Sequence, residues 1–318
     1  MARADLLLDL VAAERSGDKD RFRTLVEAVI AEERANQHHL LADRLSEIIT
    51  TTGQGRQRDE RAAAVRDLVE EIVPQRRLNE IELAPVPGRV IAELVEEQSR
   101  AELLRSYGIE PRNRVLLSGP PGNGKTSVAE AIASELMLPF YVVRYEGVVS
   151  SFLGETAARL DSAFEFARTR RCVLFFDELD TIAKERADEH ETGEIKRVVS
   201  TLLLQIDRLP AHVVLVGATN HSELLDRAAW RRFQVRAELE APSRTQSTRY
   251  LERLAARFGG DLGFAPRTLA DKLAGASFAE LEEFALDVRR RAVLQLPDPD
   301  IRQIVKERLD HWRSQASE

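Results

Sequence analysis

An eight-residue segment, GPPGNGKT at positions 119–126, constrains the fold of this chain more than any other feature. It matches the pattern G-x-x-x-x-G-K-[ST] and lies between an apolar run, Val115–Leu117, and a helical stretch, Ser127–Leu136. A glycine-rich loop between a strand and a helix lets successive backbone N–H groups point inward, at a helix N-terminus whose partial positive charge favours anions. The segment therefore predicts a phosphate-binding loop.

Two side chains at the end of this loop have predicted roles. Lys125 would reach the β- and γ-phosphates of a nucleotide, and Thr126 would supply its hydroxyl to Mg²⁺. Main-chain amides would surround the phosphates. The predicted nucleotide-binding residues of the loop are Pro121, Gly122, Asn123, Gly124, Lys125, Thr126 and Ser127.

Short apolar runs alternate with helical stretches from about residue 83 onwards. The runs that favour strands are 114–118, 140–144, 172–176, 213–217 and 234–239. Strands separated by helices indicate βαβ units and a parallel sheet with helices on both faces. After Ala241-Pro242-Ser243 the sequence favours helices as far as the C-terminus. An α/β domain followed by a helical domain is therefore predicted.

Two of the predicted strands end in polar residues. Asp177 and Glu178 follow the run 172–176, and Asn220 follows the run that begins at residue 213. Open α/β sheets bind ligands beyond the carboxyl ends of their strands. There Asp177 could help to hold the water shell of Mg²⁺, and Glu178 could orient and deprotonate a water for attack on the γ-phosphate. Asn220 could bind that phosphate or the water, because its amide both donates and accepts. Alternatively, the acidic pair is a cap and Thr-Asn a turn.

Composition excludes several classes of protein. The 318 residues carry a net charge of −7, which offers no bulk electrostatic footprint for nucleic acid. The single cysteine, Cys172, excludes an internal disulfide and a cysteine zinc site. No apolar run approaches the ~18 residues of a membrane span, and the acidic N-terminal segment differs from a secretory signal. We expect a soluble, cytoplasmic protein that does not bind membranes; the acidic balance disfavours nucleic acid as a partner but does not exclude it.

The first 80 residues contain helical patterns and one polar break. Residues 1–50 show apolar residues at helical spacing, and Asp18 could cap the second of their helices. The polar stretch 50–55 (TTTGQG) is the best linker candidate, and a weaker helical stripe over 56–73 ends before Pro74. The predicted divisions are 1–52, an N-terminal helical domain; 53–82, a linker with a short helix; 83–240, the α/β domain; and 241–318, the C-terminal helical domain.

The loop, the acidic pair and Asn220, in this order and with a helical region behind them, resemble the AAA ATPases of the wider AAA+ group. The likeness runs from about Leu83 to Trp312 and is greatest to stand-alone bacterial members with one ATPase module. It implies a P-loop module with a five-stranded parallel sheet and flanking helices, then a small helical lid, with ATP and Mg²⁺ bound between them. Lys125 and Thr126 match the Walker A positions, Asp177 and Glu178 match Walker B, and Asn220 matches sensor 1.

Two further segments can be assigned a function only through this resemblance. WRRF at 230–233 lies where these ATPases place arginine fingers, which enter a neighbouring subunit's site. The commoner family sequence there is Pro-Gly-Arg-Phe, so the choice between Arg231 and Arg232 stays open; an ordinary surface pair is the alternative. Phe152, Leu153 and Gly154 lie where a loop faces the pore of the ring, although Phe152 could instead belong to the core. Residues 186–193 would form a second pore loop, or a solvated one.

The resemblance implies an ATP hydrolase that forms a ring, a hexamer of identical subunits, and uses hydrolysis to remodel, unfold or thread a protein substrate. One alternative is a nucleic-acid-directed motor or loader, because these share the fold. Another is an ATP-dependent switch for a partner such as a subtilisin-like protease, since related bacterial ATPases occur beside peptidases. Residues 1–52 would recruit a substrate or partner, or extend the packing of the ring. The lid stretch 275–281 departs from many AAA+ proteins because it has no arginine.

Overall fold

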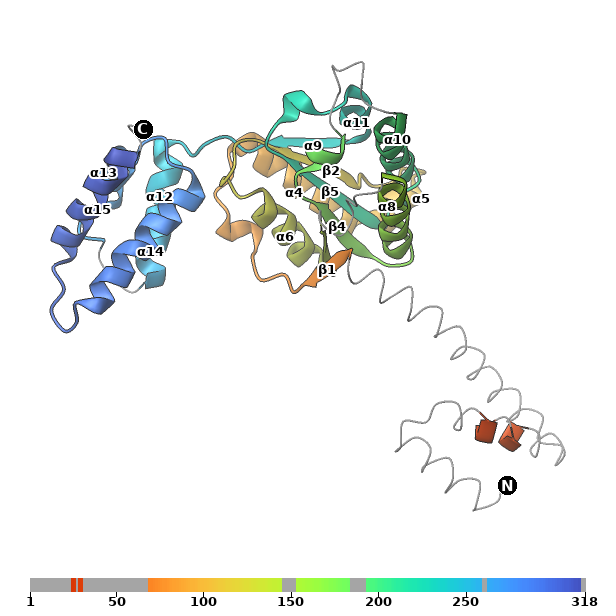
Figure 1. The fold of residues 1–318 in the computed structure, drawn as a ribbon, viewed down its shortest axis with the longest axis horizontal. Coiled ribbons are helices and arrows are strands. Elements are labelled where there is room, and N and C mark those ends of the chain that lie inside the picture. The colour runs from red at the N-terminus through yellow and green to blue at the C-terminus, as the bar shows by residue number, and fades with distance from the viewer. Residues whose placement is uncertain are drawn as a thin grey trace. The chain divides into compact units, whose positions relative to one another are not determined.

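The computed structural model describes residues 24–26, 28–30, 68–144, 153–183, 193–258 and 262–315 (Figure 1). The chain divides into two compact units, Met1–Arg66 and Asp67–Glu318. In the first unit the six described residues are helical, and Val26, Val29 and Ile30 are buried, as the helical pattern predicts. The other predictions for residues 1–66, including the cap at Asp18, lie outside the described residues.

The second unit is built on a six-stranded sheet with the order β1-β3-β4-β5-β2-β6. All neighbouring strands are parallel except β1 and β3, which are antiparallel. The five strands β2 to β6 lie within two residues of the predicted bounds, so the parallel α/β prediction is confirmed. The strands are β1 (Val69–Ile72), β2 (Arg114–Ser118), β3 (Phe140–Val143), β4 (Cys172–Phe176), β5 (Val213–Thr219) and β6 (Val235–Glu238).

Strand β1 corrects the sequence analysis, which predicted helix over this segment and five strands in the sheet. Val69 pairs with Val143 and Ile72 with Phe140, along the open edge of β3. The Arg144 guanidinium also pairs with Glu70 at 3.0 Å. Apolar residues at 65, 68, 69 and 72 fit helical spacing, but the hydrogen bonds that β3 offers outweigh this weak local preference.

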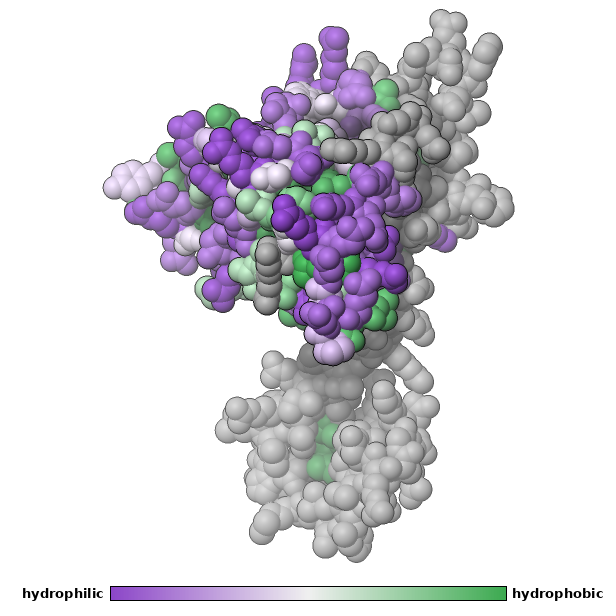
Figure 2. All heavy atoms as spheres, turned by 90° about the vertical axis from the view of Figure 1, so that its left-hand side faces the viewer, coloured by the Kyte–Doolittle hydropathy of each residue, from purple (hydrophilic) through white to green (hydrophobic). Residues whose placement is uncertain are grey.

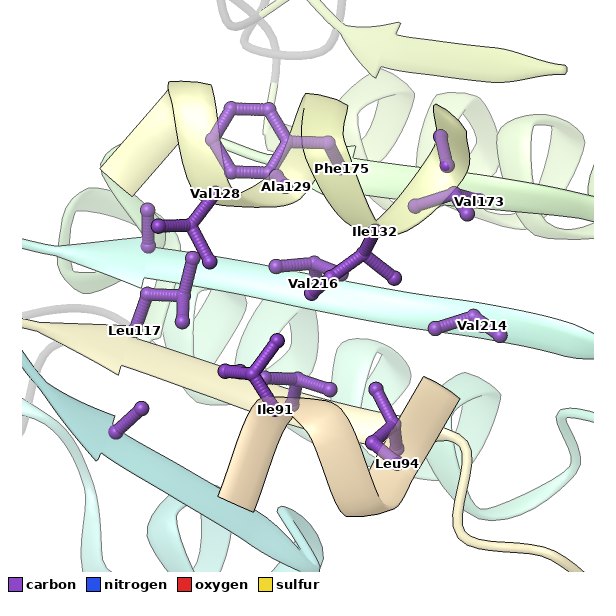
Figure 3. Close-up of a cluster of buried hydrophobic side chains, with 14 of the residues drawn as sticks. Ile91, Leu94, Leu117, Val128, Ala129, Ile132, Val173, Phe175, Val214 and Val216 are labelled. Carbon is purple, nitrogen blue, oxygen red and sulfur yellow. The ribbon is translucent and has the colours of Figure 1, made fainter. Parts of the chain in front are cut away.

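Helices cover both faces of the sheet. Ile91 and Leu94 of α4 and Ile132 of α6 lie against Val214 and Val216 of β5 on one face (Figure 3). On the other face α8 packs beside α10, and Phe164 of α8 stacks on Phe176 of β4, with ring centroids 5.4 Å apart. Strands that helices cover on both faces have continuous apolar runs in their sequence. The helices of this part are α4 (Pro85–Ser99), α5 (Ala101–Ser106), α6 (Lys125–Leu136), α8 (Leu153–Arg168), α9 (Leu179–Ala183), α10 (Gly193–Asp207) and α11 (Arg227–Arg232), with 3-10 turns η1 (Leu78–Glu80) and η2 (Ser222–Leu224).

The C-terminal helices have their own hydrophobic core, which contains Leu251, Leu269, Phe284 and Val305. In the described part of the chain no helix is long and apolar enough to cross a membrane. The face of the molecule in Figure 2 is mostly hydrophilic, with hydrophobic side chains in small groups. These helices are α12 (Arg244–Phe258), α13 (Pro266–Lys272), α14 (Phe278–Leu294) and α15 (Ile301–Gln315).

Candidate functional site

The loop 119–124 leaves the carboxyl end of β2 and turns into the N-terminus of α6. Gly119 has φ +132°, and a Cβ there would lie 2.2 Å from the carbonyl oxygen of Leu239, which follows β6. Gly122 has φ +77°, and its Cβ would lie 2.7 Å from Oγ of Ser277 in the helical lid. Both positions therefore require glycine, for the backbone conformation and for the close approach of neighbouring chain.

Lys125, the first residue of α6, is buried with 7% of its surface exposed. Its Nζ donates hydrogen bonds to the carbonyl oxygens of Gly119 at 2.6 Å and Pro120 at 3.0 Å. Burial lowers the pKa of the ammonium, and the charges of Asp177 and Asp180 oppose that shift. Phosphate oxygens are stronger partners for an ammonium than neutral carbonyls, so this lysine can exchange its loop partners for a phosphate.

The acidic pair lies in the turn between β4 and α9. Glu178 has φ +47°, a left-handed conformation that is uncommon outside glycine. The Oδ1 atom of Asp177 accepts a hydrogen bond from the backbone N–H of Glu178 at 2.9 Å, which supports this turn. Such strain concentrates at functional sites. The turn directs two consecutive carboxylates towards the edge of the sheet where the loop lies, because both residues line one cavity.

The ends of β4 and β5 are joined by side chains that the sequence analysis did not single out. The Thr219 hydroxyl donates to Oδ1 of Asp180 at 2.6 Å, and Thr219 Oγ1 accepts from the backbone N–H of His221 at 3.0 Å. These bonds fix the backbone on both sides of Asn220. The pattern Thr-Asn after a buried strand signals a turn, but only the fold shows that Asp180 is its partner.

Two asparagine side chains at the cavity hold polar atoms that have no protein partner. Oδ1 and Nδ2 of Asn123, which is 4% exposed, and Oδ1 of Asn220 are buried without a hydrogen bond among the described residues. Buried polar groups in proteins are normally satisfied. The loop and the end of β5 therefore suit a polar ligand.

A cavity of about 410 Å³ brings the predicted residues together at the carboxyl edge of the sheet. Its volume is in the range of ordinary ligand sites. All the predicted nucleotide-binding, Walker B and sensor residues line it, together with residues from the segment before α4 and from the lid. The lining residues are Arg76, Glu80, Ile81, Glu82, Pro121, Gly122, Asn123, Gly124, Lys125, Thr126, Ser127, Asp177, Glu178, Asn220, Tyr250, Phe278, Ala279 and Glu282.

The comparisons with known proteins agree with this arrangement. The model of the ATPase family associated with various cellular activities (AAA) matches residues 115–241. An uncharacterized AAA family ATPase of Sinorhizobium fredii is 36% identical over 304 residues, which cover 93% of this chain and 91% of the relative. The chain belongs to the AAA family of ATPases.

Two further relatives match parts of this AAA ATPase. A peroxisomal ATPase of Schizosaccharomyces pombe is 43% identical over 129 residues, 39% of this chain and 14% of the relative. A putative 26S proteasome regulatory subunit homolog of Methanothermobacter marburgensis is 30% identical over 221 residues, 69% of this chain and 58% of the relative. The chain spans only a part of these two proteins.

A group of apolar side chains in the cavity lining of this AAA ATPase was missed by the sequence analysis. The rings of Tyr250 in α12 and Phe278 in α14 meet edge to face with centroids 5.0 Å apart, and Ile81 lines the same cavity. The Tyr250 hydroxyl donates to Oε2 of Glu282 at 3.2 Å. Burial, with a further contribution from Glu282, raises the pKa of Tyr250 to about 12, so the ring stays neutral at physiological pH. These residues come from three separate segments, and no local pattern marks them.

The segment before α4 joins the AAA ATPase's loop helix to its lid. Glu130 of α6 accepts hydrogen bonds from the backbone N–H groups of Gln75 at 2.7 Å and Arg76 at 3.1 Å. Further along, Glu82 pairs with Arg253 of α12 at 2.5 Å. The backbone of Gly122 also accepts from the N–H of Ala279 at 3.0 Å. The walls of the cavity are therefore bonded to one another.

The two candidate arginine fingers lie on α11, outside the cavity lining. Nε of Arg232 donates to Asp207 of α10 at 2.9 Å, and its Nη1 donates to the carbonyl oxygen of Ala228 at 2.8 Å. Arg231 is exposed and makes no ion pair with the residues that the structure describes. Arg232 is therefore bound within its own chain, whereas Arg231 has no ion pair among the described residues. Which of the two is the finger stays a prediction.

The candidate pore loop is described only in part. Phe152 and residues 184–192 lie outside the described residues, and Leu153 and Gly154 open helix α8. The alternative role for Phe152 rested on the apolar face of the following helix, and Leu160 and Phe164 of that helix are buried. The pore-loop interpretation stays a prediction.

Proposed function

We propose that this AAA ATPase binds Mg-ATP in the cavity at the carboxyl edge of its sheet and acts as a ring that remodels, unfolds or threads a protein substrate. One observation carries the nucleotide site: Lys125, the acidic pair and Asn220, from three separate segments, line a single cavity of about 410 Å³. The aromatic rings of Tyr250 and Phe278 in the lining suit the adenine base, and the loop suits the phosphates.

Binding would follow from the loop. The backbone N–H groups at the start of α6 and the Lys125 ammonium would hold the phosphates. Thr126 and Asp177 offer the oxygen atoms that Mg²⁺ prefers, the hydroxyl directly and the carboxylate through water. When bound, Mg²⁺ neutralises negative charge on the β- and γ-phosphates. The unpartnered amide groups of Asn123 and Asn220 support a polar ligand at this place.

Hydrolysis would depend on Glu178. Its carboxylate would orient a water molecule and accept its proton while the water oxygen attacks the γ-phosphorus and ADP leaves. Asn220 lies between Thr219 and His221, which are hydrogen-bonded to each other. Its amide would position the water or the γ-phosphate. Catalysis would come mainly from positioning and electrostatics, because phosphoryl transfer needs little covalent help from the protein.

A second subunit would complete the site. Arg231 and Arg232 line no part of their own subunit's cavity, which supports a role at a neighbour's site. There a guanidinium would offset the charge that develops on the γ-phosphate. Relatives named as a peroxisomal ATPase and a proteasome regulatory subunit homolog support a protein substrate. Phe152 and Leu153 would then grip an extended chain in the pore.

The substitution Glu178→Gln tests this proposal. It keeps the size of the side chain but removes the base, so we expect ATP binding to persist while phosphate release falls by about 100-fold or more. ATP affinity is measured by equilibrium titration with a fluorescent analogue, and assembly with and without ATP by mass photometry. The ATP-trapped variant then serves as bait for protein substrates, with Lys125→Ala as the bait that binds no nucleotide. Hydrolysis at the wild-type rate by Glu178→Gln would contradict the assignment.

A further inference from the structure

The segment between β1 and η1 borders the cavity without a regular secondary structure of its own. Arg76 of this segment lines the cavity, and so do residues 80–82, which come shortly after it. Residues 73–77 lie in neither a helix nor a strand, so their backbone N–H groups need partners from water or from elsewhere in the chain. Figure 1 shows the segment passing beside α6, and η1 contacts that helix. The position of this cavity wall therefore depends on what α6 offers.

One carboxylate of α6 supplies the missing partners. Oε1 of Glu130 accepts hydrogen bonds from the backbone N–H groups of Gln75 at 2.7 Å and Arg76 at 3.1 Å, and Oε2 lies 3.9 Å from Nε of Arg76. The Glu130 side chain is only 18% exposed, so water competes little for these bonds. Hydrogen bonds to an ionised acceptor are stronger than those between neutral groups. Both oxygen atoms of Glu130 therefore hold two consecutive residues of the segment.

The same helix begins at the phosphate loop. Lys125 is its first residue, and five residues of an α-helix rise about 7.5 Å, so Glu130 stays at a fixed distance from that loop. Five residues further along the helix, Oε1 of Glu135 accepts from the backbone N–H of Leu78 at 3.3 Å. Helix α6 thus joins the loop that would hold the phosphates to the wall that contains Arg76.

Arg76 lies near one of the aromatic side chains in the cavity lining. Burial and the charge of Glu282 raise the pKa of Tyr250, and the positive charge of Arg76 opposes that shift, so the guanidinium lies within electrostatic reach of the ring. A guanidinium can stack on an aromatic base and can donate hydrogen bonds to hydroxyl groups. The wall that Glu130 holds therefore suits the nucleoside part of a nucleotide.

We propose that Glu130 is a positioning residue for the nucleoside of ATP. It holds residues 75–82 against α6, and this segment then contacts the base or the ribose while the loop binds the phosphates. The inference rests on the nucleotide site of the proposed function and adds a residue that lies outside the cavity lining. Because Glu130 acts through the segment, its loss should weaken ligands that carry a nucleoside and spare those that consist of phosphates alone.

The negative charge of Glu130 predicts the opposite effect on affinity. A carboxylate near a triphosphate repels it, so removal of that charge should by itself strengthen the binding of anions. A loss of ATP affinity would therefore come from the geometry of the wall. This difference in sign separates a positioning role from a purely electrostatic one.

Three substitutions of Glu130 test the proposal. Glu130→Ala removes both oxygen atoms, Glu130→Gln keeps an Oε1 atom that can accept from the same N–H groups, and Glu130→Asp keeps the charge but draws it back by one methylene. Glu102→Ala is the matched control, because Glu102 is an exposed glutamate of α5 outside the cavity lining. Titration calorimetry gives the dissociation constants of ATP and of inorganic tripolyphosphate, each with Mg²⁺. Hydrogen exchange of the peptide 74–80 reports whether the segment is held.

We expect Glu130→Ala to raise the dissociation constant of ATP by about tenfold and to leave that of tripolyphosphate unchanged or lower. The peptide 74–80 should exchange faster in this variant, because two of its N–H groups lose their acceptor. Glu130→Gln should bind ATP within about threefold of the wild-type affinity, since one uncharged acceptor remains. Glu102→Ala should bind both ligands normally. If Glu130→Ala does not fold, Glu130→Asp must show the same selective loss of ATP affinity to a smaller extent.

Several results would overturn the proposal. An equal loss of affinity for ATP and tripolyphosphate would show that Glu130 supports the fold of the whole site, and unchanged exchange of the peptide would show that it does not hold the segment. If the wild type and Glu130→Ala bind both ligands equally well, this inference is wrong and the nucleotide site stands. If the wild type binds neither ligand, the proposed function is wrong and this inference falls with it.

Discussion

Glu178, the predicted base, lies in a strained backbone conformation. Its φ of +47° costs free energy, of the order of 1 kcal/mol, which the bond from its N–H to Asp177 helps to offset. A side chain in an ordinary helical or extended conformation at this point would leave the turn in another direction. The acidic pair therefore behaves as one unit, in which Asp177 supports the turn and Glu178 presents its carboxylate to the cavity.

We expect Lys125 to bind the phosphates of ATP and Phe278 to contact its base, so that each residue contributes a separate part of the affinity. Lys125→Ala removes the cation at the phosphates, so we expect binding of ATP and of inorganic tripolyphosphate to weaken alike, by about tenfold or more. Titration calorimetry measures both ligands. Lys306→Ala, an exposed lysine of α15, is the control and should bind normally. Wild-type affinity in Lys125→Ala would contradict the loop assignment.

The substitution Phe278→Ala removes an aromatic ring that we place beside the base. Loss of one stacking ring typically costs about 1–3 kcal/mol, so the affinity for ATP should fall by about tenfold. Tripolyphosphate has no base, and its affinity should stay unchanged in the same calorimetric titration. An equal loss for the two ligands would show that the ring acts on the fold of the site rather than on the base.

Among the elements, the ends of β4 and β5 are linked by a side-chain hydrogen bond, and we call these two linked ends the joined edge. The predicted site residues Asp177, Glu178 and Asn220 directly follow these strands, and the Thr219–Asp180 bond links the two strand ends. Thr219 is fully buried, so its hydroxyl has no water to replace a lost partner. We expect this bond to help to hold Glu178 and Asn220 in place relative to each other.

The substitution Thr219→Val tests this positioning role. It should lower kcat by about tenfold while KM for ATP stays near the wild-type value, because binding depends on the loop and hydrolysis depends on the joined edge. Steady-state phosphate release gives both constants. Thr219→Ser retains the hydroxyl and should recover most of kcat. If Thr219→Ser and Thr219→Val lose activity equally, packing of the methyl group, and not the hydrogen bond, is what matters.

At the scale of the whole molecule, the second unit places its cavity where the α/β part and the lid meet. Glu130 holds the segment before α4, Glu82 of that segment pairs with Arg253 of the lid, and Gly122 bonds to Ala279. The walls of the cavity are therefore linked across the α/β part and the C-terminal helices.

Mixing experiments test whether a neighbour's arginine completes the site. Arg231→Ala and Arg232→Ala subunits retain Glu178, whereas Glu178→Gln subunits retain both arginines. If the finger acts in trans, a mixture of Glu178→Gln with the correct arginine variant should release phosphate faster than the sum of the two proteins alone, by several-fold. The arginine variant that shows this rescue identifies the finger. Simple additivity for both arginines would favour the surface-pair alternative.

The glycine-rich loop, five strands and the polar residues at two strand ends could be predicted from the order of the amino acids. These features are local: the loop's chemistry resides in consecutive backbone amides, and a strand covered on both faces needs a continuous apolar run. The strand at residues 69–72 could not be predicted in this way, because the hydrogen bonds that hold it belong to β3. The fold also brings Ile81, Tyr250 and Phe278 to one cavity and Asp207 to Arg232. Such contacts join segments far apart in the chain, where spacing along the sequence carries no information about distance in space.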